Sequence, residues 1–303
     1  MATILSQGDR LTIRYHTMKP SFLCALLAAG LLLAACQAPA PTQPAAIVTP
    51  PNEIQMSETP RPAGQSSLTV FAAASLTEAF TDIARAFKTE NPGIEVLFNF
   101  AGSQQLAQQL AQGAPADVFA SANNTQMDAA VSAGRVAEAS TQTFVRNRLV
   151  VIYPRGNPAN LARLQDLAHP GLKLLLAAKE VPVGGYSLGF LEKASQAADF
   201  GRDFMEKVLA NVVSYEENVR AVYSKVALGE ADAGIVYATD IPKDDPDSVG
   251  KLDIPDELNV AAAYPIAPVV DSANPPLAKS FVDFVLSPAS QTILAGYGFS
   301  PAH

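Results

Sequence analysis

Apolar positions along the chain follow two spacings that alternate after residue 67. Short apolar runs predict buried strands, at residues 68–72, 94–100, 117–121, 149–153, 173–177 and 233–237. Between several of these runs, apolar residues recur every three or four positions. This spacing predicts helices, at residues 76–90, 104–111, 219–229 and 276–286. Alternation of this kind indicates an α/β fold with mainly parallel sheets.

An apolar run near the N-terminus has a different character. Residues 21–35 have the length of a signal-peptide core and are too few for a membrane-spanning helix, which needs roughly 20. The Leu-Ala-Ala-Cys sequence at 33–36 resembles the lipobox of bacterial lipoproteins. We therefore expect residues 1–35 to be a signal peptide and Cys36 to carry lipid, with an ordinary cleaved signal as the alternative. A start at Met18 would leave a compact Met-Lys region before the apolar run.

Residues 36–67 are rich in Pro, Ala, Gln, Ser and Thr and contain few side chains that could pack. This composition is typical of a disordered tether, so we expect folding to begin at Leu68. A lipid on Cys36 would hold the folded part at the membrane, as an extracytoplasmic protein of the periplasm or cell surface.

Composition narrows the class of partner and of site. The 303 residues include 21 basic and 29 acidic ones, a formal charge of −8, which argues against nucleic-acid binding because phosphate contacts need a basic surface. The two cysteines, Cys24 and Cys36, both precede the expected fold, and the three histidines are His16, His169 and His303. The folded part therefore offers no disulfide and no raw material for a zinc cluster.

Two strand-to-helix junctions carry a serine where a helix is expected to begin. Ser75 has Glu78 three residues later, as in a capping box, and Ser103 follows Gly102. Helix N-termini bind anions because they offer free N–H groups and the positive end of the helix dipole. Each serine alone fits a simple cap. Two of them at the carboxyl ends of consecutive parallel strands, where α/β sheets bind ligands, favour a binding site.

Residues 185–189, Gly-Tyr-Ser-Leu-Gly, match the G-x-S-x-G pattern of serine hydrolases. That pattern needs a tight strand–turn–helix and a following acid and histidine. The only histidine downstream is His303, and no apolar strand runs directly into the motif. A secreted serine hydrolase is therefore the weaker alternative, and we expect neither catalysis nor a cofactor.

Five segments together resemble the periplasmic molybdate-binding proteins of bacterial importers. They are VFAAASLTEAF (70–80), FAGSQQLAQQLAQGAPADVFASA (100–122), VPVGGYS (181–187), ENVRAV (217–222) and GIVYATD (234–240). The resemblance covers residues 68–300 in order.

This resemblance implies a two-lobed Venus-flytrap fold with two crossover strands and the ligand in the cleft. Residues 68–147 and 241–303 would form the first lobe, and residues 148–240 the second. The protein would capture molybdate or tungstate and deliver it, as a monomer, to the permease of an ATP-driven (ABC) importer.

By the same resemblance, hydroxyl and backbone N–H groups would bind the oxyanion, with no metal site beyond it. The donors would be the hydroxyls of Ser75, Ser103 and Tyr237 and the backbone N–H groups of Val183 and Val219. The family often has alanine at Val183, which a backbone donor tolerates, and aspartate at Asn218, which is no named side-chain ligand.

A carrier of another tetrahedral oxyanion is the nearest alternative. A buried dianion must meet several donors, and protonated phosphate also needs a buried carboxylate acceptor. The expected site includes no Asp or Glu. Sulfate differs from molybdate mainly in size, so the sequence leaves sulfate as an alternative ligand.

Overall fold

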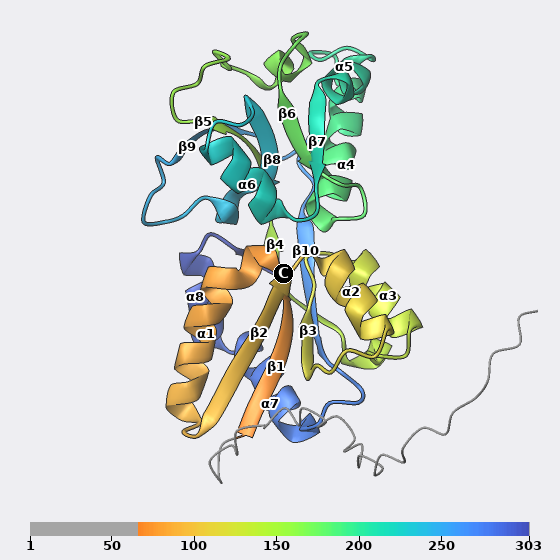
Figure 1. Ribbon diagram of the computed structural model, residues 1–303, viewed down its shortest axis with the longest axis vertical. Helices are drawn as coiled ribbons and strands as arrows, with labels where there is room; N and C mark the ends of the chain where they lie inside the picture. Colours follow the sequence, from red (N-terminus) through yellow and green to blue (C-terminus); the bar gives the residue numbers. More distant parts are fainter. Residues whose placement is uncertain (1–65, 303) are drawn as a thin grey trace, which may run out of the picture. The chain divides into compact units, whose positions relative to one another are not determined.

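The computed structural model describes residues 66–302, which form two sheets flanked by helices (Figure 1). The expected signal peptide, the lipidation site Cys36 and nearly all of the tether lie outside the described residues. The first strand begins at Ser66, just inside the range expected for the tether. Across residues 66–302, none of the helices has the length and apolar character needed to cross a membrane.

The strands form two mixed sheets, and most helices follow a strand in the sequence. The first sheet has the order β11 (Ser300–Pro301), β4 (Gln142–Asn147), β10 (Ala262–Pro268), β3 (Val118–Ala120), β1 (Ser66–Ala73) and β2 (Ile94–Ala101). The second has the order β7 (Val212–Glu216), β6 (Leu174–Ala177), β8 (Ala233–Tyr237), β5 (Leu149–Pro154) and β9 (Val249–Asp253). The helices are α1 (Thr77–Glu90), α2 (Ser103–Ala111), α3 (Asn124–Ser132), α4 (Pro182–Gln196), α5 (Phe204–Ala210), α6 (Val219–Ala227), α7 (Pro275–Leu286) and α8 (Pro288–Gly296). Short 3-10 helices are η1 (Ala74–Leu76), η2 (Glu138–Ser140), η3 (Leu164–Ala168) and η4 (Ala238–Asp240).

We call the first sheet with η1, α1, α2, α3, α7 and α8 the first lobe, and the second sheet with α4, α5, α6 and η4, which follows β8 and packs on α6, the second lobe. In the first lobe, α1 and α8 lie on one side of the sheet, and α2 and α3 lie on the other (Figure 1). The helical spacing in α1 places Phe80, Ile83 and Phe87 on one buried face. Phe87 meets Phe281 of α7 edge to face, with ring centroids 5.2 Å apart. Phe80, in the first turn of α1, also meets Phe281 edge to face, at 6.3 Å, so α1 is held against α7 along its length.

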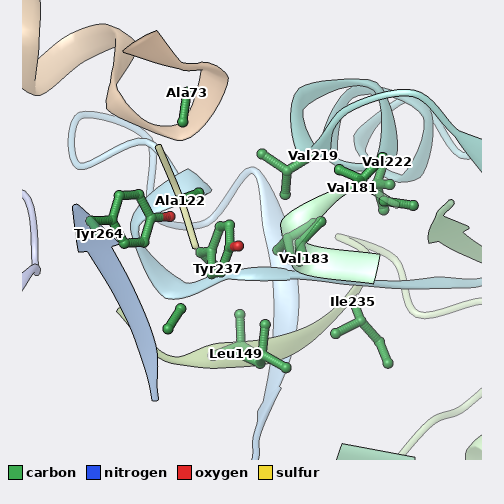
Figure 2. Close-up of a cluster of buried hydrophobic side chains, with 14 of the residues drawn as sticks. Ala73, Ala122, Leu149, Val181, Val183, Val219, Val222, Ile235, Tyr237 and Tyr264 are labelled. Carbon is green, nitrogen blue, oxygen red and sulfur yellow. The ribbon is translucent and has the colours of Figure 1, made fainter. Parts of the chain in front are cut away.

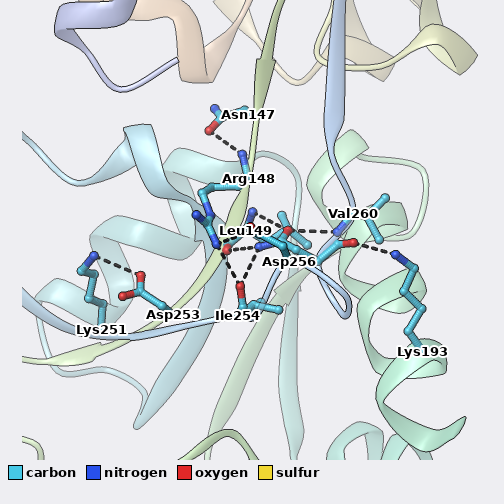
Figure 3. Close-up of polar contacts among 10 residues, drawn as sticks. Asn147, Arg148, Leu149, Lys193, Lys251, Asp253, Ile254, Asp256 and Val260 are labelled. Carbon is cyan, nitrogen blue, oxygen red and sulfur yellow. Dashed lines mark hydrogen bonds and ion pairs between the residues drawn. The ribbon is translucent and has the colours of Figure 1, made fainter. Parts of the chain in front are cut away.

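The chain passes between the two sheets twice, as the family resemblance implied. Arg148 joins β4 to β5, and residues 254–261 join β9 to β10. Asn259 ties the two passages together: its side-chain oxygen accepts a hydrogen bond from the Leu149 N–H at 3.0 Å, and its amide donates to the Leu149 carbonyl at 2.9 Å. Figure 3 shows the polar contacts around Arg148, Leu149 and Val260. The two connections therefore run side by side.

Two details differ from the sequence-based expectation. The sheets are mixed rather than mainly parallel, because every strand next to a passage pairs antiparallel: β4 and β10 in the first sheet, β5 and β9 in the second. The expected return to the first lobe at residue 241 is too early. Strand β9 pairs with β5, with Val150 opposite Asp253, so the chain re-enters the first sheet only at β10. Only Val249 of the five residues of β9 is buried, so its apolar pattern was too weak to assign from the sequence.

Candidate functional site

One small cavity lies where the two lobes face each other, at the N-terminal ends of η1, α2, α4 and α6. It is lined by Ala73, Ala74, Ser75, Ala101, Gly102, Ser103, Ala122, Val181, Pro182, Val183, Asn218, Val219 and Tyr237. The cavity is small, with room for about one water molecule. All five residues expected to bind the ligand line it.

The two serines of the first lobe reach the cavity, but neither caps its helix through its side chain. Ser75 lies in η1, and its hydroxyl is hydrogen-bonded to the Tyr264 hydroxyl at 2.8 Å. Ser103 is the first residue of α2, and its hydroxyl accepts a hydrogen bond from the Ala122 N–H at 3.0 Å. The expected capping box of Ser75 and Glu78 is wrong, because the intervening turn η1 moves the N-cap of α1 to Leu76. Both hydroxyls are thus fixed by tertiary contacts at the cavity wall.

The two valines of the second lobe occupy the first turns of α4 and α6. Val183 follows Pro182 at the start of α4, and Val219 is the first residue of α6. Backbone N–H groups at these positions have no intrahelical acceptor. The Asn218 side chain caps α6 by accepting a hydrogen bond from the Ala221 N–H at 3.0 Å, a role that aspartate fills equally well. The departure from the family pattern at Asn218 therefore leaves the N-terminus of α6 intact.

Tyr237 closes the cavity at the end of β8. Its side chain lies between Tyr264 and Val183 in Figure 2, with ring centroids of Tyr237 and Tyr264 5.7 Å apart. The residue is 1% exposed, and its hydroxyl has no hydrogen-bond partner. Burial raises the pKa of Tyr237 well above the usual value for tyrosine, so the phenol remains a neutral donor. A buried hydroxyl without a partner costs free energy, and a ligand oxygen in the cavity would supply the missing acceptor.

The cavity attracts anions through dipoles rather than through charged side chains. Its lining residues include neither Lys nor Arg, and neither Asp nor Glu. Helix N-termini from both lobes point their free N–H groups and their partial positive charge toward it. Among residues 66–302, no group of three or more His, Cys, Asp or Glu side chains is placed to hold a metal ion. The arrangement suits reversible capture of an oxyanion.

Residues 185–189, the G-x-S-x-G match, lie inside α4 rather than on a strand–turn–helix. Ser187 is fully buried, and its hydroxyl donates to the carbonyl of Val183 at 2.7 Å, one helical turn earlier. A buried serine whose hydroxyl is hydrogen-bonded within its own helix is not placed to act as a nucleophile. The geometry that a hydrolase motif requires is therefore missing at this position.

Sequence reasoning missed Asp240, the buried acid behind Tyr237. One of its oxygens, Oδ2, accepts a hydrogen bond from the Tyr237 N–H at 2.9 Å, which holds the end of β8 in place. Burial raises the pKa of Asp240 to about 6, and nearby Arg220 lowers it only in part. In the sequence, Asp240 looks like any acid in a loop after a strand, so no pattern marked it.

Asp240 makes stability depend on pH in a direction opposite to most acids. Its folded pKa of about 6 exceeds the ordinary value of 3.8, so its protonated form stabilises the fold at low pH and this contribution is lost as the pH rises through 6. Asp240→Asn keeps an acceptor for the Tyr237 N–H and does not ionise. Between pH 4 and 7.5, the variant should gain on the order of 3 kcal/mol in unfolding free energy relative to the parent. Urea unfolding across this range tests it; parallel pH curves for the two proteins would contradict it.

Contacts between the lobes bridge the cleft around the cavity. The Gln104 amide donates to the Glu217 carbonyl at 2.8 Å, and the Gln105 amide donates to the Glu217 carboxylate at 3.2 Å. On another edge, the Gln126 amide donates to the Glu180 carbonyl at 3.0 Å. The backbones approach closely here, since a Cβ on Gly102 would lie 2.6 Å from the Glu217 carbonyl oxygen. The cavity is therefore enclosed by contacts that would break if the lobes moved apart.

Comparisons with known proteins agree with this architecture. The family model of bacterial extracellular solute-binding proteins matches residues 68–300. The chain is 36% identical to the molybdate-binding protein ModA of Mycobacterium tuberculosis, over 95% of this chain and 99% of the relative. It is 34% identical to ModA of Escherichia coli, over 78% of this chain and 90% of that relative.

The similarity extends to solved structures. The sulfate-binding protein SubI of Mycobacterium tuberculosis superimposes with a TM-score of 0.69 at 20% identity, over 78% of this chain and 87% of that one. At this identity the likeness shows the two-lobed fold alone. On the match over residues 68–300 and the identity to curated relatives, the chain belongs to the family of bacterial extracellular solute-binding proteins.

Proposed function

We propose that this protein captures molybdate or tungstate outside the cytoplasm and delivers it to the permease of an ABC importer, without catalysing a reaction. The observation that carries the proposal is the unpartnered, buried hydroxyl of Tyr237 in a cavity that also collects Ser75, Ser103, Val183 and Val219. The names of the relatives at 36% and 34% identity support molybdate as the ligand.

Five neutral donors are enough to hold a dianion. Hydrogen bonds to a charged group contribute about 1.5–3 kcal/mol each, and several of them together offset the cost of taking the dianion out of water. No counter-charge lines the cavity, and the ligand can leave without breaking a buried ion pair. Such a site fits a carrier that must both bind tightly and release.

Ligand choice tests the proposal directly. In calorimetric titrations of the purified chain with an oxyanion panel, molybdate and tungstate should bind far more tightly than sulfate or phosphate. Phosphate should be the weakest, because its protonated form finds no carboxylate acceptor among the lining residues. Equal affinities for sulfate and molybdate would overturn the choice of ligand but not the oxyanion class.

Sulfate is the second candidate, because a sulfate-binding protein shares the fold. The two ions differ mainly in size, so the volume of the closed cavity decides between them. A chain that binds sulfate more tightly than molybdate in the same titrations would establish this alternative.

For the N-terminal region we propose removal of residues 1–35 and lipidation of Cys36, with residues 36–65 as the tether and the protein acting as a monomer. The support is the Leu-Ala-Ala-Cys sequence that closes the apolar run. Cys36→Ser should release the protein from the membrane fraction or leave it unprocessed. Cys24→Ser, inside the apolar run, is the matched control and should not change the fractionation. Wild-type protein found free and unmodified, with cleavage elsewhere, would disprove the anchor.

A further inference from the structure

Arg220 connects the lobes immediately beside the cavity. It is the second residue of α6, next to Val219, and its guanidinium is hydrogen-bonded to the carboxylate of Glu78 on α1. Its Nε also donates to the Ala74 carbonyl of η1 at 3.4 Å. Because Ala74 and Val219 both line the cavity, this contact joins the two helix ends that face each other across it.

A second carboxylate stands close to the same guanidinium. Asp240 is fully buried, and its Oδ1 has no hydrogen-bond partner but lies 3.8 Å from Nε of Arg220. A buried carboxylate oxygen without a donor is costly. A small movement of Arg220 would satisfy it, yet the contacts with Glu78 and Ala74 hold the guanidinium away.

The two carboxylates differ in which lobe they belong to. Asp240 and Arg220 lie in the second lobe, so their contact is available whether the cleft is open or closed. Glu78 lies in the first lobe, so its contact with Arg220 exists only when the lobes meet. The two carboxylates face different nitrogens of the guanidinium: Glu78 contacts Nη2, whereas Asp240 faces Nε, which donates to the Ala74 carbonyl. Asp240 therefore competes with Ala74 for Nε, and the contacts with Glu78 and Ala74 both depend on closure.

We propose that Arg220 is a positioning residue that clasps the cleft shut through Glu78, while Asp240 competes for its guanidinium and favours reopening. Arg220 does not line the cavity, so it acts on capture and release through the closed form rather than through the ligand. This inference rests on the proposed function in one respect: it assumes that the oxyanion is bound inside the closed cleft.

The two carboxylates should have opposite effects on release. Glu78→Gln weakens the clasp, so the full chain should release labelled molybdate about two- to fivefold faster, the range expected for a partly exposed ion pair. Asp240→Asn removes the competitor but keeps an acceptor for the Tyr237 N–H, so release should slow by a similar factor. A merely structural role for Asp240 would instead make the release faster.

The matched control is Glu90→Gln, at the exposed end of α1, which makes the same charge change away from the clasp. It should leave the release rate unchanged. Label–chase experiments with excess unlabelled molybdate measure all rates at constant ionic strength. Faster release from Asp240→Asn, or equal acceleration by Glu78→Gln and Glu90→Gln, would overturn the proposal.

A double-variant comparison covers the possibility that Asp240→Asn does not fold. If Glu78 acts only through Arg220, then Arg220→Gln and the Arg220→Gln/Glu78→Gln double variant should release molybdate at the same rate. Faster release from the double variant than from Arg220→Gln would mean that the two residues act independently, and would refute the proposal.

A ligand-free readout separates the clasp from the choice of ligand. The distance between fluorophores on α3 and α5, measured without any oxyanion, should lengthen in Glu78→Gln and shorten in Asp240→Asn. If the wild-type chain fails to bind molybdate while these distances shift as expected, the proposed function fails and the clasp stands. Unchanged distances in a chain that binds molybdate would refute the clasp alone.

Discussion

Tyr237→Phe is expected to weaken molybdate binding by roughly ten- to a hundredfold while the ligand-free protein stays at least as stable as the parent. The hydroxyl is buried without a partner, so its removal ends a desolvation cost in the free protein. In the complex, the same change removes one charge-assisted hydrogen bond, worth about 1.5–3 kcal/mol. Calorimetric titration and thermal unfolding of the ligand-free chain measure the two effects separately.

Substitutions of the two serines provide the comparison, because they should lower both the affinity and the stability. Ser75→Ala removes a partner of the Tyr264 hydroxyl, and Ser103→Ala leaves the Ala122 N–H without its acceptor. Each should therefore lose stability as well as roughly ten- to a hundredfold in affinity. If Tyr237→Phe loses stability but keeps its affinity, the phenol supports the fold and does not bind the ligand.

Gly184→Ala should reduce affinity by more than about a hundredfold, through the backbone rather than through a lost side chain. A Cβ at this position would lie 2.0 Å from the Ala178 carbonyl oxygen and 2.5 Å from that of Ala177. Both are backbone atoms at the end of β6, so the first turn of α4 must shift and carry the Val183 N–H with it. Overpacking of this kind also costs about 1–3 kcal/mol of stability.

Gly185→Ala is the matched control, one residue further along the same helix. Its added Cβ would lie 3.4 Å from the Lys179 carbonyl oxygen, an ordinary contact. Alanine is the better helix former by up to about 1 kcal/mol, so this variant should keep its affinity and not lose stability. Titration and urea unfolding of both variants test the pair. Equal affinities would mean that the first turn of α4 does not contribute to binding.

Apolar spacing was sufficient to predict many elements and the α/β class. The run 68–72 became β1, the helical spacing of Phe80, Ile83 and Phe87 became α1, and the helix expected to end at Gly229 ends just before it. Gly229 has φ +77, a left-handed conformation that glycine adopts at helix ends. Patterns of this kind were readable because burial of one helix face, or of a whole strand, leaves its period in the sequence.

The same reasoning failed where burial was partial or the motif was ambiguous. Strand β9 has one buried residue among its five, and its place in the second sheet could not be predicted from its residues. Residues 185–189 look like a hydrolase motif in the sequence but lie within the continuous helix α4 in the fold. The hydrogen-bond partner of the Ser75 hydroxyl was expected within its own helix. It is the hydroxyl of Tyr264, 189 residues further along the chain.

By itself, the sequence determined the alternation of strands and helices, the acidic charge that disfavours nucleic acid, and the segments that carry the family resemblance. Only the tertiary structure decided that Ser75, Ser103, Val183, Val219 and Tyr237 line one cavity, since they come from strand and helix ends that only folding brings together. Tertiary structure alone also brought Asp240 and Glu78 to the same guanidinium, that of Arg220. The physical reason is that local periodicity records which residues are buried, whereas the partners of a buried polar group depend on how distant segments pack.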